Sequence, residues 1–383
     1  MPCSLQRLLL CLTLLLALGC GGATGGTTLY VYDNATSSVL AWSDVNKVYS
    51  SAEAGTTVAA ADRTIVNGLG SGTELAWGGL ALDNSSNRLY LVTTGGLVYV
   101  IKKASSQSGT VSALTDIISF NLGQSGVDPY SDGSVFGEAT VDATSNTLFV
   151  LEGAADGSAA RVWKITNASD VVSGTIFTPA ASYTTGVSTD TFGCGVAAIP
   201  GGNLYGLFGG GGALYNGLGT VAYSGPRLRK SSSGVLTSPL GSLYSSGAVV
   251  GALTELGSPL EYGSLAYDSQ NLALYVFAPD SAAATDAAIL VFTSGSFSPG
   301  LDVAPSRSLG DTAWALASLR IIAHPADGDW LLGADFTLTS GSTIGAGTGG
   351  DTLLIWKAPS GGSAAITAKM TGTSEIRGMA IGD

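Results

Sequence analysis

The sequence repeats itself, and this repetition constrains the fold more than any other feature. The segment GGLALDNSSNRLYLV (78–92) returns as GEATVDATSNTLFVL (137–151) and GSLAYDSQNLALYVF (263–277), and more weakly at 195–207 and 319–333. The residues that close the first half of each copy, with a last mark at the C-terminal end, are separated by 59, 58, 68, 56 and 58 positions. They are Asp83, Asp142, Pro200, Asp268, His324 and Gly382. Such regular spacing indicates one structural unit used several times.

Each unit has the pattern of four short β-strands. Third strands follow each copy, as in LVYVIKKA from position 97 and LLIWKAPS from position 353, and fourth strands are visible at 116–122 and 364–370. β-branched or aromatic residues that alternate with others, between Gly, Asn and Ser, are typical of strands and their turns. We therefore expect an all-β chain of four-stranded antiparallel meanders.

The two ends of the chain complement each other. RGMAIGD (377–383) reads as a first strand with nothing after it, and TTLYVYDNATSSVLAWSDV (27–45) as a second and third strand with nothing before them. Together they make one complete unit. Radially repeated four-stranded units with one shared unit are typical of a β-propeller, and the shared blade leaves no long open edge. We expect six blades in a single domain, 27–383. Seven is the alternative, since one step is 68 residues, although a Gly-rich insertion at 209–219 would account for the excess.

The GLALD…NRLYLV unit resembles the six-bladed propellers of the NHL-repeat and TolB-like kind. The resemblance covers nearly all of 27–383, but its motif specifies a blade and no chemistry. Propellers of this kind include lactone hydrolases, quinoprotein dehydrogenases, scaffolds and binding modules, so the fold does not determine the function.

The N-terminus reads as an export signal. Arg7 precedes an apolar run from Leu8 to Leu18, which is the anatomy of a secretory signal peptide (1–19). The following ALGC resembles the lipobox of bacterial lipoproteins, with Ala17 and Leu18 in swapped positions. The resemblance implies a lipid on Cys20 and a flexible tether over 20–26. The alternative is an ordinary signal peptide cut near Gly19. Gly21 is not the Asp of the inner-membrane retention signal, which favours the outer membrane of the cell envelope.

Cysteine and charge content narrow the function classes. With Cys3 and Cys11 in the signal peptide and Cys20 lipidated, only Cys194 remains, so no intrachain disulfide is expected. Without the signal peptide the chain has 28 acidic and 15 basic residues. This balance argues against a nucleic-acid partner, which requires a basic surface. Cys194 is expected to be a buried small apolar residue.

We expect any binding site on the rim of the propeller where the first strands begin and the long loops lie. Long loops are predicted between second and third strands at 152–160, 209–225, 278–288 and 335–351. Such loops usually carry function, although here they are equally explained as Gly/Ser-rich padding. The opposite rim, with short uniform turns such as NSSN and ATSN, is predicted to be structural.

The blade connections on the loop-bearing rim supply the candidate residues. They are Glu138, Asp132, Asp190, Glu261, Tyr262, Arg320, Arg377, Trp77 and Trp314. Glu138, Ser264, Arg320 and Gly378 hold equivalent positions near the central channel. Glu138 could form an ion pair across the channel with Arg320 or Arg377, since buried charges need partners. The recurring aromatic residues suit packing between blades, or a platform for stacking sugars.

Catalysis has little support in the sequence. The single histidine, His324, is expected in a turn before Pro325, and no Gly-x-Ser-x-Gly elbow occurs, so no catalytic residue is assigned. The leading hypothesis is a membrane-tethered, non-enzymatic propeller that binds a protein, glycan or small-molecule ligand, with no cofactor. The alternative is a calcium-dependent lactone or ester hydrolase of the gluconolactonase-like type. In that reading Glu138, Asp132, Asp190 and Glu261 are the candidate metal ligands. A purely structural envelope protein is the third possibility.

Overall fold

The computed structural model describes the following residues, and every structural statement below concerns these ranges. They are 26–66, 74–110, 116–123, 135–153, 161–178, 182–184, 192–211, 223–232, 235–237, 244–245, 248–249, 264–278, 288–293, 306–309, 319–324, 330–335, 352–361 and 366–382. The predicted signal peptide and lipidation site therefore lie outside the described residues. Within them, no helix has the length and apolar character needed to span a bilayer.

The described strands form six sheets of four or five strands and one two-stranded ribbon. From the inner strand outward, the first two sheets are β28 (Ile376–Gly382), β1 (Thr28–Asp33), β2 (Ser38–Trp42), β3 (Arg63–Val66), β7 (Gly109–Thr110), and β4 (Leu75–Asp83), β5 (Arg88–Thr93), β6 (Leu97–Lys102), β8 (Ile117–Leu122), β12 (Ile176–Phe177). The next two are β9 (Val135–Asp142), β10 (Thr147–Gly153), β11 (Arg161–Thr166), β13 (Ser182–Thr184), and β14 (Phe192–Ile199), β15 (Asn203–Gly211), β16 (Tyr223–Ser232), β17 (Val235–Thr237). The last two are β20 (Ser264–Asp268), β21 (Ala273–Ala278), β22 (Ala288–Thr293), β23 (Arg307–Leu309), and β24 (Leu319–His324), β25 (Trp330–Asp335), β26 (Thr352–Lys357), β27 (Ile366–Lys369). The ribbon pairs β18 (Tyr244–Ser245) with β19 (Ala248–Val249).

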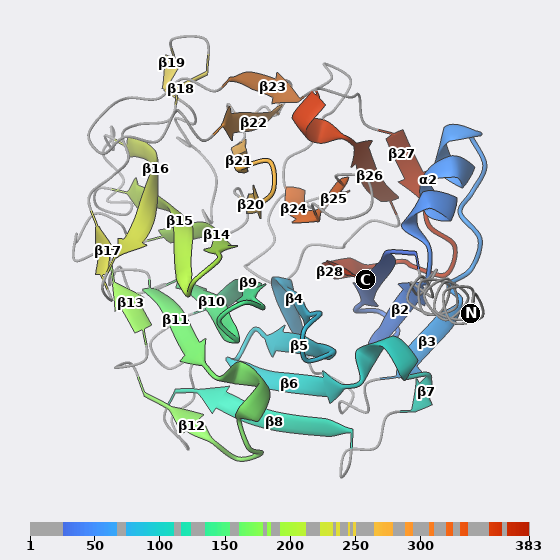
Figure 1. Cartoon of the computed structure of the whole chain (residues 1–383), viewed down its shortest axis with the longest axis horizontal. Coiled ribbons are helices and arrows are strands. Elements are labelled where there is room, and N and C mark those ends of the chain that lie inside the picture. Colours follow the sequence, from blue (N-terminus) through green and yellow to red (C-terminus); the bar gives the residue numbers. More distant parts are fainter. Residues whose placement is uncertain are drawn as a thin grey trace, which may run out of the picture.

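These sheets stand around a common centre, as Figure 1 shows. Each inner strand contacts the next, in the order β28, β4, β9, β14, β20, β24, and β24 contacts β28 again. The contacts therefore close a ring, and the predicted all-β propeller is confirmed. The blade number stays a prediction, because the ribbon stands among residues outside the described ranges.

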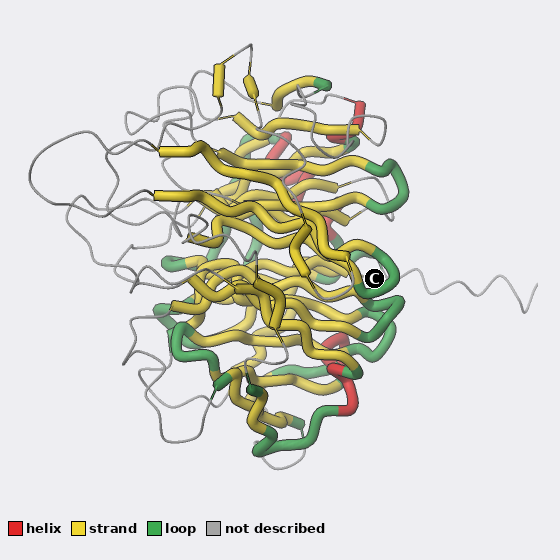
Figure 2. Tube along the Cα trace, turned by 90° about the vertical axis from the view of Figure 1, so that its left-hand side faces the viewer, coloured by secondary structure: helices red, strands yellow, loops and turns green. Residues whose placement is uncertain are grey.

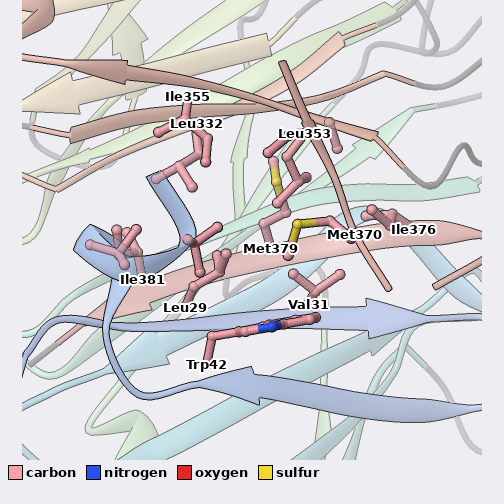
Figure 3. Close-up of a cluster of buried hydrophobic side chains, with 14 of the residues drawn as sticks. Leu29, Val31, Trp42, Leu332, Leu353, Ile355, Met370, Ile376, Met379 and Ile381 are labelled. Atoms are coloured by element: carbon pink, nitrogen blue, oxygen red, sulfur yellow. The ribbon is translucent and has the colours of Figure 1, made fainter. Parts of the chain in front are cut away.

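The chain closes the ring by pairing its two ends, as the sequence predicted. Strand β1 pairs with β28 in antiparallel register from Thr28 with Gly382 to Asp33 with Ile376. Behind this pair lies a buried apolar cluster that joins the shared blade to the β24–β27 blade (Figure 3). Leu29, Val31 and Met379 pack there against side chains such as Leu353. Burial of apolar surface across the junction stabilises the closed ring.

A short helix, which the sequence analysis did not anticipate, fastens the same junction from outside. Helix α2 (Val45–Glu53) begins at Asp44, whose carboxylate accepts the amide proton of Asn46, as expected of an N-cap. The helix contacts β27, and its Tyr49 ring lies 5.5 Å from the ring of Trp330. The Lys357 ammonium lies 5.5 Å from the centre of the Trp330 ring, within cation–π range.

The outer edges of three blades are covered by the next blade around the ring. Strand β12 pairs in parallel with β8, and β7 pairs in parallel with β3. Val58 forms a parallel bridge with Met370, next to β27. In each case the covering residues come from the connection between the third and fourth strands of the next blade. These additions hide main-chain groups that an open edge would offer to other chains.

Candidate functional site

The ring has two ends, the turn rim and the loop rim. The turn rim is the end where the inner strands finish, with turns 84–87, 143–146, 200–202 and 269–272. The loop rim is the opposite end, where the inner strands begin and where the turn 34–37 lies. The C-terminal end of the chain lies on the turn rim, at the right of Figure 2.

A cavity of about 290 Å³ occupies the centre of the ring. Inner strands β4, β9, β14, β20 and β28 contribute to its wall. The side chains of Leu82, Val141 and Tyr267 are half-buried there, whereas residues nearer the loop rim, such as Leu80 and Leu265, are buried. Because exposure increases toward the turn rim, the cavity opens on that side.

The wall of the cavity is mixed in chemistry. Most lining side chains are aliphatic, while each inner strand is also the edge of its sheet and turns main-chain N–H and C=O groups toward the channel. Among the described lining residues there are two carboxylates, Glu138 and Asp142, and no Lys, Arg or His. The cavity therefore suits a small neutral molecule with an apolar body and a few polar groups, and it disfavours an anion.

Glu138 is buried near the inner end of the cavity, at 5% exposure. One carboxylate oxygen accepts a hydrogen bond from the Val196 amide nitrogen at 2.9 Å, and the other accepts one from the Ser264 hydroxyl oxygen at 2.5 Å. Glu138 on β9 thus connects two further inner strands, β14 and β20. The predicted partner of Glu138 was an arginine, and the hydrogen bond with Ser264 was not predicted.

A glycine and several shifts in strand register allow the Glu138 side chain to contact β14 and β20. A Cβ on Gly195 would stand 2.8 Å from the Leu265 amide nitrogen and 3.0 Å from a Glu138 carboxylate oxygen, so only glycine fits between β9 and β20. The pairing register shifts in inner strands β4, β9, β14 and β28, each time near the level of Glu138. Bulges of this kind redirect side chains, here toward neighbouring inner strands.

At the turn rim, carboxylates at the ends of inner strands are satisfied within the turns. Asp142 accepts hydrogen bonds from the Thr144 and Ser145 hydroxyls, and one from the Gly202 amide of the next blade at 2.6 Å. Burial would raise the pKa of Asp142, but these hydrogen bonds outweigh burial and hold the pKa below its ordinary value. Asp83 and Asp268 cap their own turns in the same way.

Two tyrosines stand at the β14–β20 side of the ring. The rings of Tyr205 and Tyr267 are 5.4 Å apart in an edge-on arrangement. Burial, and then the neighbouring Tyr267, raise the pKa of Tyr205 to about 12. Burial and the nearby Asp268 also raise the pKa of Tyr267. Both phenols stay neutral at ordinary pH, which leaves the mouth without a tyrosinate.

Arg377 is a charged residue enclosed at the loop rim, at 3% exposure. Its guanidinium forms ion pairs with Glu74 and with Glu375, the latter at 2.8 Å. It also stacks on the ring of Trp77, with its central carbon 4.5 Å from the ring centre. Trp77 therefore packs against an arginine of the neighbouring blade, which is a role in blade packing.

The remaining candidates stay predictions. Arg320 lies on β24, but its side chain is outside the described residues, so its ion pair with Glu138 is untested. Asp132, Asp190, Glu261, Tyr262 and Trp314 also lie outside the described residues, as do most of the long loops. Within the described ranges, no group of three or more His, Cys, Asp or Glu side chains converges as a metal site would require.

Sequence reasoning missed the cavity and the partners of Arg377. Glu74 and Glu375 come from separate blade connections, and only the closure of the ring brings them together. Their sequence signal is that each lies just before an inner strand. The cavity had no signal of its own, since its wall residues are the small and aliphatic residues of ordinary strands.

Comparison with known proteins adds no family. No family model matches the chain, and no curated protein matches it. Among solved structures, it is similar to the Cps50 (Swd1) β-propeller domain of Myceliophteria thermophila, with 9% identity, 93% of this chain and 88% of that chain covered, and a TM-score of 0.43. It is also similar to Kuenenia stuttgartiensis hydrazine synthase, with 10% identity, 79% and 68% covered, and a TM-score of 0.39. At such identity and score these proteins indicate no activity for this chain.

Proposed function

We propose that this chain is an exported, non-enzymatic binding propeller, tethered to the cell envelope by a lipid on Cys20. Its channel holds a small neutral molecule with both apolar and polar parts. The cavity of about 290 Å³ carries this proposal, because an apolar cavity about half as large already binds benzene. The long loops of the opposite rim are the proposed surface for a protein or glycan partner.

Binding is favoured over catalysis by the way Glu138 and Ser264 are used. A serine hydroxyl that donates a hydrogen bond to a carboxylate is one arrangement that can activate the serine as a nucleophile. However, Ser264 is 0% exposed and is not among the residues that line the cavity. Its hydroxyl is therefore not presented to a substrate, and the pair acts as a link between inner strands.

The calcium-dependent hydrolase is the competing proposal. Both oxygens of Glu138 already accept hydrogen bonds from neutral donors, and its predicted co-ligands lie outside the described residues. Melting of the domain from Gly26 to Asp383 with EDTA and then with calcium separates the two proposals, because a ligand of the native state raises the midpoint. A calcium-dependent rise that Glu138→Gln removes would favour the hydrolase.

The cavity is tested with two fluorescent probes of opposite character. Titration with neutral N-phenyl-1-naphthylamine should show saturable binding, and the anionic probe 8-anilinonaphthalene-1-sulfonate should bind more weakly. Ala198→Trp places an indole in the cavity and should abolish binding of the neutral probe, whereas Ala35→Trp, on an exposed turn, should not. Binding that survives Ala198→Trp at an unchanged melting midpoint would exclude the cavity as the site.

A further inference from the structure

The described chain enters the propeller at the turn rim. The first residue of β1, Thr28, pairs with Gly382 at the far end of β28, and the Thr27 carbonyl accepts the Val45 amide proton. Neighbouring Ile381 and Asn84 line the cavity. The tether, the C-terminal strand end and the mouth of the cavity therefore share one rim.

We propose that the turn rim lies against the lipid surface to which the chain is anchored, so that the cavity opens toward the membrane. This inference rests on the lipid anchor at Cys20 proposed above. It goes beyond that proposal by assigning the orientation of the domain and the surface that contacts lipid headgroups.

The length of the tether decides between the two rims. Five residues separate Cys20 from Gly26, and the six steps along the chain span at most about 20 Å when fully extended. Inner strand β9 has eight residues, so the wall of the ring is about 26 Å high. A tether that starts at the turn rim is thus too short to pass along the wall and turn the loop rim toward the bilayer.

The chemistry of the turn rim fits a headgroup surface. The chain is acidic, with a formal net charge of −12, and an anionic membrane would repel exposed carboxylates. In the turns of this rim Asp83, Asp142 and Asp268 are at most 4% exposed, because the turns enclose them, although Asp170, beside the turn 143–146, is exposed. The exposed side chains of these turns are neutral; most are polar, as in Asn84 and Gln270, and one, Leu272, is a large apolar side chain at 45% exposure. The polar groups can form hydrogen bonds with headgroups, and the exposed Leu272 can lie among them.

The orientation assigns different partners to the two rims. The cavity would exchange its ligand with the membrane surface, and the loop rim would face away from the membrane toward a partner. Both surfaces would then work at the same time, since neither blocks the other.

The test places a reporter on each rim of the full, lipidated chain. In a Cys194→Ser background, Gln270→Cys on the turn rim and Ala35→Cys on the loop rim are both exposed positions. Each is labelled with bimane after reconstitution into phosphatidylethanolamine and phosphatidylglycerol vesicles that contain a headgroup spin label. We expect the spin label to quench the reporter at position 270 several times more strongly than the reporter at position 35.

Two controls keep the outcomes distinct. An insertion of about 20 Gly and Ser residues after Gly25 should remove the difference, because the longer tether lets the domain rotate. Equal quenching with the natural tether, or stronger quenching at position 35, would overturn the orientation. The Cys20→Ser variant should not float with vesicles. If the natural chain also failed to float, the lipid anchor of the proposed function would be refuted.

Discussion

Glu138 and Asp142 stand on the same inner strand, four positions apart, and are bonded in different ways. Asp142, at the turn rim, takes its partners mostly from its own turn, with one amide from the next. Glu138, toward the loop rim, takes its partners from β14 and β20. One carboxylate shapes a turn, while the other joins three blades. The comparison teaches that a propeller can be locally built at one rim and held together across blades at the other.

The largest effect should follow from removal of the link between blades. Glu138→Ala leaves the Val196 amide and the Ser264 hydroxyl buried without this acceptor, and each such loss costs about 1–3 kcal/mol. We expect the free energy of unfolding to fall by about 3 kcal/mol in chemical denaturation. Glu53→Ala on the exposed face of α2 is the control and should change it by less than about 0.5 kcal/mol. A similarly small effect at Glu138 would remove the distinction between the rims.

A smaller loss should follow from filling the space beneath Glu138. Gly195→Ala places a methyl group against main-chain atoms of Leu265 and Ser264, and overpacking of this kind costs about 1–3 kcal/mol. Gly361→Ala adds the same methyl group where no atom lies within 4 Å, so it should be nearly neutral. Unfolding curves of the two variants check the pair. Equal stability would show that β9, β14 and β20 do not need their close approach.

Loss of one turn cap should matter less and should stay local. Asp268→Ala removes the acceptor for the amides of Gln270 and Asn271, which sit in an exposed turn where water can replace it. We expect a loss of about 1 kcal/mol. Amide exchange should quicken in 269–272 and remain unchanged in the inner strands. Faster exchange in β9 or β14 would mean that the turn rim is also coupled across blades.

The smallest expected effect is on the dependence of stability on acidic pH, through Asp142. The folded-state pKa of Asp142 lies below its ordinary value of 3.8, so its contribution to stability is present above that value and is lost as the pH falls below it. Asp142→Asn cannot titrate, and its stability should decline less steeply with falling pH in this range. Denaturation midpoints between pH 5 and pH 2.5 measure the two slopes. Parallel slopes would contradict the role of the turn hydrogen bonds.

The two rims also differ in how far the sequence predicts them. The strand-end positions of the turn rim recur at the steps of the repeat, and Asp83, Asp142 and Asp268 occupy three of them and form hydrogen bonds with neighbours in sequence, so their positions could be read from the repeat. The closure of β28 on β1 was predictable because the two ends complement each other. Glu74, which pairs with Arg377, and the partners of Glu138 lie on other blades, and no short-range pattern encodes them. Helix α2 was missed although Val45, Val48 and Ala52 follow a helical spacing, because the helix has only nine residues and lies inside a blade, where the repeat predicts strands.

The pairing of β1 with β28 has a consequence in time. Strand β1 can pair with β28 only after β28 has been synthesised. The edges of β3 and β8 likewise pair with β7 and β12, which are synthesised later. Bringing together residues so distant along the chain carries a high entropic cost, and topologies of this kind fold slowly. The ring therefore closes only after β28 has been synthesised, which would suit the export proposed above. Unfolding should begin at the same seam.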